Sequence, residues 1–86
     1  MENKRNRFLS YIYRKSKEGI HSIKFSDIEK EIGLSHNEII DQITDLKDIM
    51  REHKLGFFQV IPQGDFIEVK IDFKKRDEIF ATLLAL

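Results

Sequence analysis

The sequence predicts one small α+β domain with the element order α-β-α-α-β-β-α, and three observations lead to this prediction. Residues 26–50 contain two helix-start signals separated by a glycine, which is typical of two helices joined by a tight turn. Residues 56–73 contain two strand-like runs around a turn at 62–65, which predict a β-hairpin. Apolar residues at helical spacing near both ends of the chain predict a first and a last helix.

The first helix is expected over residues 3–18, followed by a short strand over residues 20–25. Gly19 is well placed to end the helix, because glycine adopts a left-handed backbone conformation at little cost. The strand is indicated by a weak alternation of apolar and polar residues. The apolar face of the helix consists of Phe8, Leu9 and Ile12.

The central pair of helices has a start signal before each helix. Ser26 with Glu29, and Ser35 with Glu38, have the spacing of capping boxes, in which serine and glutamate side chains satisfy first-turn amides. Gly33 lies between the two, where the chain must turn sharply. The second helix is expected from residue 36 to about residue 53. The apolar stripes on the two helices consist of Ile28, Ile32, Ile39, Ile43, Leu46 and Met50.

These residues resemble a helix-turn-helix, and the pattern that carries the likeness is I-x-x-x-I-G-L-S-x-x-x-I-x-x-x-I-x-x-L. The hairpin that follows extends the resemblance to the winged-helix family, over about residues 5–73. The resemblance implies a winged helix-turn-helix fold in a single domain spanning residues 1–86. Within it, the helix-turn-helix core would span 26–53, the wing hairpin 56–73 and a C-terminal helix 74–86.

The second strand of the hairpin alternates between apolar and polar residues. Ile67, Val69, Ile71 and Phe73 are expected to face the core, while Phe66 faces outward near the turn. The tip of the hairpin carries no arginine or lysine, which is unusual for a wing that contacts DNA.

The last helix is strongly apolar, and its packing partner is open at the sequence level. It can dock on the first helix of its own chain, or it can associate with a second copy. The second alternative predicts a homodimer whose tentative interface consists of Ile79, Phe80, Leu83 and Leu84.

The net charge of zero hides a strong asymmetry along the chain. Residues 1–24 contain seven basic and two acidic residues, whereas residues 25–53 contain eight acidic and three basic residues. The expected outer face of the second helix of the pair carries five acids and one base. In a DNA-binding winged helix this face enters the major groove, where carboxylates would be repelled by the phosphates.

Two functional hypotheses follow from these features. The family resemblance implies a small DNA-binding transcriptional regulator that binds duplex DNA as a dimer. Its tentative DNA-binding residues are Lys4, Arg5, Arg7, Ser35, His36, Lys47, Arg51 and Lys70. The alternative is a protein–protein interaction module without direct DNA binding, because an acidic helix face beside exposed aromatic residues suits a basic partner surface. Its interface would consist of Glu38, Asp41, Asp45, Asp48 and Phe66.

Other classes of function lack a matching pattern in the sequence. There is no cysteine, and His21, His36 and His53 are too scattered for a metal motif, so we expect neither metal nor cofactor. No nucleophile–base pair or glycine-rich phosphate loop is present, and we expect no enzymatic activity. No apolar run reaches the length of a membrane helix, and the N-terminus lacks the apolar core of a signal peptide. We therefore expect a cytoplasmic location, or a nuclear one in a eukaryote.

Overall fold

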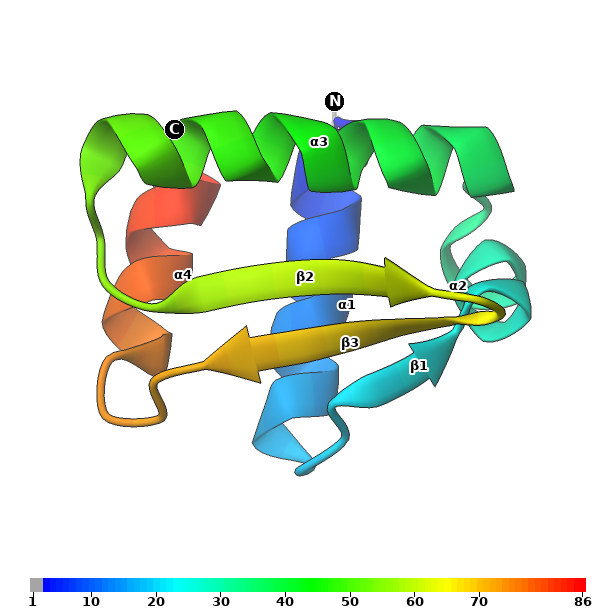
Figure 1. The fold of residues 1–86 in the computed structure, drawn as a ribbon, viewed down its shortest axis with the longest axis horizontal. Helices are drawn as coiled ribbons and strands as arrows, with labels where there is room; N and C mark the ends of the chain where they lie inside the picture. Colours follow the sequence, from blue (N-terminus) through cyan, green and yellow to red (C-terminus); the bar gives the residue numbers. More distant parts are fainter. Residues whose placement is uncertain (1–2) are drawn as a thin grey trace.

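Residues 3–86, the part of the chain that the computed structural model describes, form four helices and one three-stranded antiparallel sheet (Figure 1). Their order agrees with the order predicted from the sequence. The elements are α1 (Lys4–Lys17), β1 (Ser22–Lys24), α2 (Phe25–Ile32), α3 (His36–His53), β2 (Phe58–Gln63), β3 (Phe66–Ile71) and α4 (Arg76–Ala85).

The sheet has the strand order β1-β3-β2, so the last strand lies in the middle. Strands β2 and β3 form a hairpin in which Gln63 pairs with Phe66 across a two-residue loop. Gly64 occupies the first loop position with a φ of 57°, a conformation that glycine adopts without steric cost. The loop is therefore shorter than the four-residue turn expected from the sequence.

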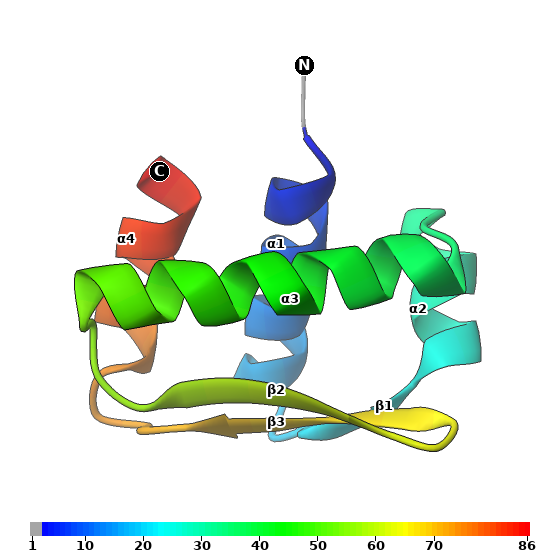
Figure 2. The same ribbon diagram turned by 45° about the horizontal axis from the view of Figure 1, so that its top comes forward.

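The helices surround two sides of this sheet. Helix α3 runs alongside β2, while α1 and α4 cross behind the strands, and α2 lies at the hairpin end (Figures 1 and 2). The inward faces of the strands and helices enclose one core. Its largest fully buried apolar side chains are Phe8, Leu9, Ile12, Ile28, Leu34, Ile39, Ile67, Ile79, Phe80 and Leu83.

The local signals for α3 are confirmed. Ser35 Oγ accepts from the Glu38 backbone N–H at 3.2 Å, and Glu38 Oε1 accepts from the Ser35 N–H at 2.9 Å. Gly33 ends α2 with a φ of 69°. The second capping box and the glycine turn thus form as predicted, because both depend on residues within one turn of each other.

The prediction that Ser26 and Glu29 form a capping box at the start of α2 is wrong. Helix α2 begins two residues earlier than a Ser26 cap requires, at Phe25, and its N-cap is Lys24, which makes no side-chain capping bond. The Phe25 ring is buried, and its N–H donates to the Asp65 carbonyl at 2.9 Å. These tertiary contacts hold Phe25 at the start of the helix, so Ser26 lies in the first turn, where it cannot act as the cap.

Phe73 was also predicted wrongly. Strand β3 ends at Ile71, and Phe73 lies in the following turn with 62% of its surface exposed. The alternation that buries Ile67, Val69 and Ile71 stops with the strand, because it requires a continuous pleat.

Helix α4 packs within its own chain. Ile79, Phe80 and Leu83 are completely buried, and the Phe80 ring stacks on Tyr13 of α1 and packs against Phe58 of β2, with centroid distances of 4.8 and 5.0 Å. These three residues are therefore not available for the expected dimer interface. Leu84 is half-buried against the same core.

This packing predicts a large loss of stability from Leu83→Ala. Removing a fully buried leucine side chain leaves a cavity and should lower the free energy of unfolding by about 3 kcal/mol. Leu86→Ala, at a half-exposed position, is the matched control and should change it by less than about 0.5 kcal/mol. Urea unfolding at two protein concentrations checks the prediction. A transition midpoint that rises with protein concentration would instead indicate packing between chains.

Candidate nucleic-acid interface

An open groove runs between α3 and β2, along one edge of the sheet. It has a volume of about 480 Å³. Its polar lining residues are Lys47 and Arg51 of α3 and Gln59 of β2. The remaining lining residues are Ile43, Leu46, Met50, Phe58, Val60 and Ile61.

The flank of α3 that faces β2 contains no carboxylate. Residues of a helix advance by about 100° each, so Lys47 and Arg51 lie about 80° and 120° from the buried Ile39. Asp41, Asp45 and Asp48 lie about 180° to 240° from it, on the outer side of the helix. Lys47 and Arg51 therefore line the groove, which no carboxylate lines, while Arg51 also lies about 60° from Asp48 around the helix.

Two polar residues of the hairpin lie on the outer face of the neighbouring sheet. Gln59 and Lys70 are paired across β2 and β3, and both side chains are exposed on the face of the sheet away from the core. Lys47, Arg51 and Lys70 thus come from the groove wall and the neighbouring strands. Gln59 was missed from the sequence, although its place between the buried Phe58 and Val60 would have identified it as an outward residue of β2.

Arg51 also contacts a carboxylate. Its Nη2 lies 3.4 Å from Asp48 Oδ1, one turn earlier on α3. Both side chains are mostly exposed, at 78% and 62%, so solvent screens the pair and it contributes little to stability. The guanidinium can therefore exchange this partner for a phosphate.

Two of the three basic residues predicted to bind DNA near the N-terminus have partners within the chain. Lys4 forms an ion pair with Glu38 of α3, and Arg7 Nη1 donates to the Ile32 carbonyl at the end of α2, at 2.9 Å. Arg5 is half-buried. Since Glu38 lies on the flank of α3 away from β2, these residues are not brought together with Lys47, Arg51 and Lys70.

Ser35 and His36 likewise have structural contacts at the start of α3. Ser35 forms the cap described above, and the His36 ring packs on Phe25 at a centroid distance of 4.2 Å. Their exposed atoms lie near the first turn of α3, toward the hairpin end of the molecule.

The structure does not bring the residues of the predicted protein interface together on one surface. Asp41, Asp45 and Asp48 are exposed on α3, whereas Glu38 is occupied by the cap and by Lys4. Phe66 lies at the hairpin turn, 39% exposed, and lines grooves formed with β1 and α2. It does not line the groove along α3 and β2.

Other kinds of site were sought among the described residues. Residues 3–86 contain no group of three or more histidine, aspartate or glutamate side chains arranged to hold a metal ion. No helix in the same range is long and apolar enough to cross a membrane. Comparison with protein-family models, curated proteins and solved structures found no match for this chain.

The cap of α3 gives a prediction on pH. Hydrogen bonds from Lys4 and then from the Ser35 backbone lower the pKa of Glu38 from 4.5 to about 2. Because the folded-state pKa is depressed, the ionised carboxylate stabilises the folded protein above pH 4.5, and this contribution is lost as the pH falls toward 2. In Glu38→Gln, which keeps an acceptor but has no charge, this component of the acid destabilisation should disappear.

Urea unfolding of both proteins at several pH values below 6 measures this difference. A side-chain NMR titration of Glu38 in the folded wild type provides the independent check. An NMR midpoint near the unperturbed 4.5 would contradict the assignment of the cap and the Lys4 ion pair as the cause.

Proposed function

We propose that the protein is a winged-helix domain that binds duplex DNA through the β2-facing flank of α3 and the adjoining hairpin, and that it acts as a small transcriptional regulator. The observation that supports this most strongly is the separation of charge on α3. Lys47 and Arg51 line the groove beside β2, and the carboxylates of the same helix lie on another strip. The order of helices and strands is compatible with the winged-helix resemblance of the sequence.

The dimensions of α3 suit this role. An 18-residue helix is about 27 Å long, and the major groove is wide enough, at about 12 Å, to admit a helix. With the β2-facing flank turned toward one DNA strand, Lys47 and Arg51 would contact phosphates, and Lys70 on β3 would contact the backbone beside the groove. The exposed Gln59 and Thr44 provide hydrogen-bonding groups for base edges or phosphates.

This placement differs from the interface expected from the sequence. Lys4 and Arg7 are not included, because their contacts with Glu38 and with the Ile32 carbonyl hold them away from the β2-facing flank of α3. A dimer through α4 is not included either, because Ile79, Phe80 and Leu83 are buried. The proposal therefore concerns one domain bound to one site.

The proposal predicts a defined dependence on salt. Three phosphate contacts from Lys47, Arg51 and Lys70 correspond to a slope of about −2.7 in a plot of log affinity against log salt. Duplex binding, measured by fluorescence anisotropy, should therefore weaken about 40-fold between 50 and 200 mM salt. In the triple variant Lys47→Ala, Arg51→Ala, Lys70→Ala, the slope should approach zero.

A matched control removes one arginine and two lysines elsewhere. The variant Arg14→Ala, Lys17→Ala, Lys30→Ala changes the net charge equally, at exposed positions on α1 and α2. It should keep most of the slope, because these residues lie outside the α3–β2 groove. Equal losses in both triple variants would show that DNA contacts no particular face, and would refute the proposed interface.

A second candidate function is binding to a basic protein surface through the acidic strip of α3. It is favoured by the exposure of Asp41, Asp45 and Asp48, of which Asp48 alone has a cationic partner among the described residues. The two functions respond in opposite ways to neutralisation of this strip. A protein partner would lose its complementary charge, whereas DNA would lose a source of repulsion.

We therefore expect Asp41→Asn, Asp45→Asn, Asp48→Asn to bind duplex DNA more tightly, by about fivefold at low salt. The anisotropy titration of this variant beside the wild type measures the change. Weaker DNA binding would mean that these carboxylates support the interface instead of opposing it, and the groove-centred docking would then be wrong.

A further inference from the structure

The first strand leaves one edge of the sheet open. Strand β1 pairs with β3 on one side only, because it is the terminal strand in the order β1-β3-β2. The Val69 N–H donates to the His21 carbonyl at 2.8 Å, and the Phe25 N–H donates to the Asp65 carbonyl at 2.9 Å. Since hydrogen-bonded positions alternate in an antiparallel pair, the backbone groups of Ser22 and the N–H of Lys24 point to the open edge.

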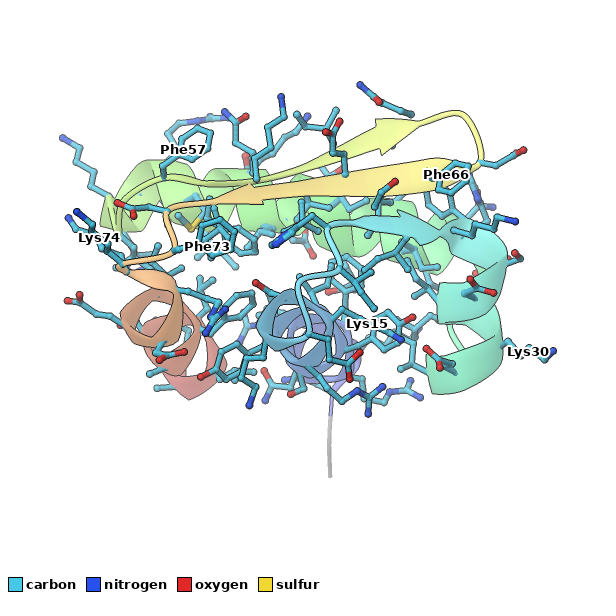
Figure 3. All side chains as sticks on the ribbon, turned by 90° about the horizontal axis from the view of Figure 1, so that it is seen from below. Lys15, Lys30, Phe57, Phe66, Phe73 and Lys74 are labelled. Atoms are coloured by element: carbon cyan, nitrogen blue, oxygen red, sulfur yellow. The ribbon has the colours of Figure 1, made fainter. Side chains whose placement is uncertain are left out.

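A second groove lies along this edge, between α1, β1 and α2. Its volume is about 600 Å³. Its lining residues include Lys15 of α1, Lys30 of α2 and Phe66 at the end of the hairpin, and Figure 3 shows the Lys30 side chain extending outward from α2, on the side away from α1. Ser22 and Lys24 of β1 also line it, so the unpaired backbone groups of the strand face a space rather than a neighbouring element.

The Tyr11 hydroxyl lines the same groove, beside the Glu31 carboxylate. Tyr11 is only 2% exposed, and its hydroxyl lies within reach of Glu31. Burial, followed by the hydrogen bond and the charge of Glu31, raises the pKa of Tyr11, so the hydroxyl keeps its proton and is a donor. Buried polar groups in folded proteins are nearly always paired, so an acceptor on a bound molecule would replace Glu31 or share this donor with it.

The charged and apolar residues around the groove indicate which molecule would fit. Lys24 and Lys30 form no ion pair with any residue in the described range 3–86, and Lys15 has only a long contact of 3.8 Å with Glu31. Ile20 and Phe66 are each 39% exposed beside them. Asp27 and Glu31 also line the groove, so it carries three lysines, two carboxylates and a partly apolar surface beside the unpaired strand backbone.

We propose that this groove binds an extended peptide segment of a partner protein that carries carboxylate side chains, which adds to β1 as a fourth strand. Backbone N–H and C=O groups of the segment pair with Ser22 and Lys24. A carbonyl or carboxylate oxygen of the segment accepts from the Tyr11 hydroxyl, and its acidic side chains contact Lys24 and Lys30. Addition of a strand to an open sheet edge is a common mode of peptide recognition.

The lysines also argue against a second copy of this chain as the occupant. A second β1 strand would offer the segment Ser22–Lys24, which carries a lysine and no carboxylate, and it would bring the lysines of both grooves closer together. The proposal does not depend on the DNA-binding proposal, because the two grooves share no lining residue.

The test is an NMR titration of the full chain with a capped hexapeptide of alternating valine and glutamate. We expect saturable shifts centred on the amides of Ser22, Ile23 and Lys24. A hexapeptide of alternating valine and lysine controls for charge, and should bind at least tenfold more weakly. A glutamate peptide that is N-methylated along one edge cannot pair through that edge and should also bind poorly.

Three variants distinguish specific contacts from general attraction. Tyr11→Phe should weaken binding about fivefold, as expected for one lost hydrogen bond, and should leave the amide spectrum folded. Lys24→Glu, Lys30→Glu should abolish binding, whereas the control Lys17→Glu, Lys74→Glu should retain it. Ser22→Pro removes an N–H that points outward, so it should weaken peptide binding while β1 still pairs with β3.

Several outcomes would overturn the proposal. These are the absence of shifts at millimolar glutamate peptide, shifts centred outside β1, or equal binding of the glutamate and lysine peptides. Shifts of Ser22 and Lys24 on concentrating the protein alone, accompanied by dimerisation in sedimentation, would identify a second copy as the occupant instead. None of these measurements involves DNA, so failure here leaves the α3–β2 interface untouched.

Discussion

The packing of Phe80 is the contact on which the arrangement of this small domain depends. Its ring stacks on Tyr13 of α1 and packs against Phe58 of β2, so one side chain of the last helix connects the first helix to the sheet. A domain of 86 residues has a limited core, and it cannot leave an apolar helix unused without losing much of the burial that stabilises it. The C-terminal helix therefore completes the core of its own chain.

The packing of this core determines where the helices lie relative to the two edges of the sheet. With α1 and α4 behind the sheet, α3 lies along the β2 edge and covers it in part, while the β1 edge stays open at the opposite side (Figures 1 and 3). The α3–β2 groove and the groove along β1 follow from this asymmetry. One combines a helix flank with a hairpin and suits a nucleic-acid backbone, and the other exposes unpaired strand groups and suits an extended chain.

Ion pairs and hydrogen bonds within the chain determine which charged side chains stay available to a binding partner. Lys4 and Arg7 look like an anion-binding N-terminal arm, yet one is paired with Glu38 and the other holds the end of α2 through the Ile32 carbonyl. Both contacts fasten α1 to the two central helices. The basic residues that stay exposed and line grooves include Lys47 and Arg51 on one side of the sheet and Lys24 and Lys30 on the other. A neutral net charge thus coexists with two locally basic grooves.

The sequence by itself determined the features that depend on neighbouring residues. These include the limits of α3, its Ser35–Glu38 cap, the turn at Gly33 and the order of helices and strands, because capping, turn conformation and alternation are set within a few residues. Only the tertiary structure decided that Phe25 rather than Ser26 begins α2, and that Phe73 is exposed. It also decided which flank of α3 faces β2, and hence that Lys47 and Arg51 both line a groove that no carboxylate lines. Such features depend on contacts between residues far apart in the chain, such as the hydrogen bond from Phe25 to Asp65. A pattern of neighbouring residues therefore cannot predict them.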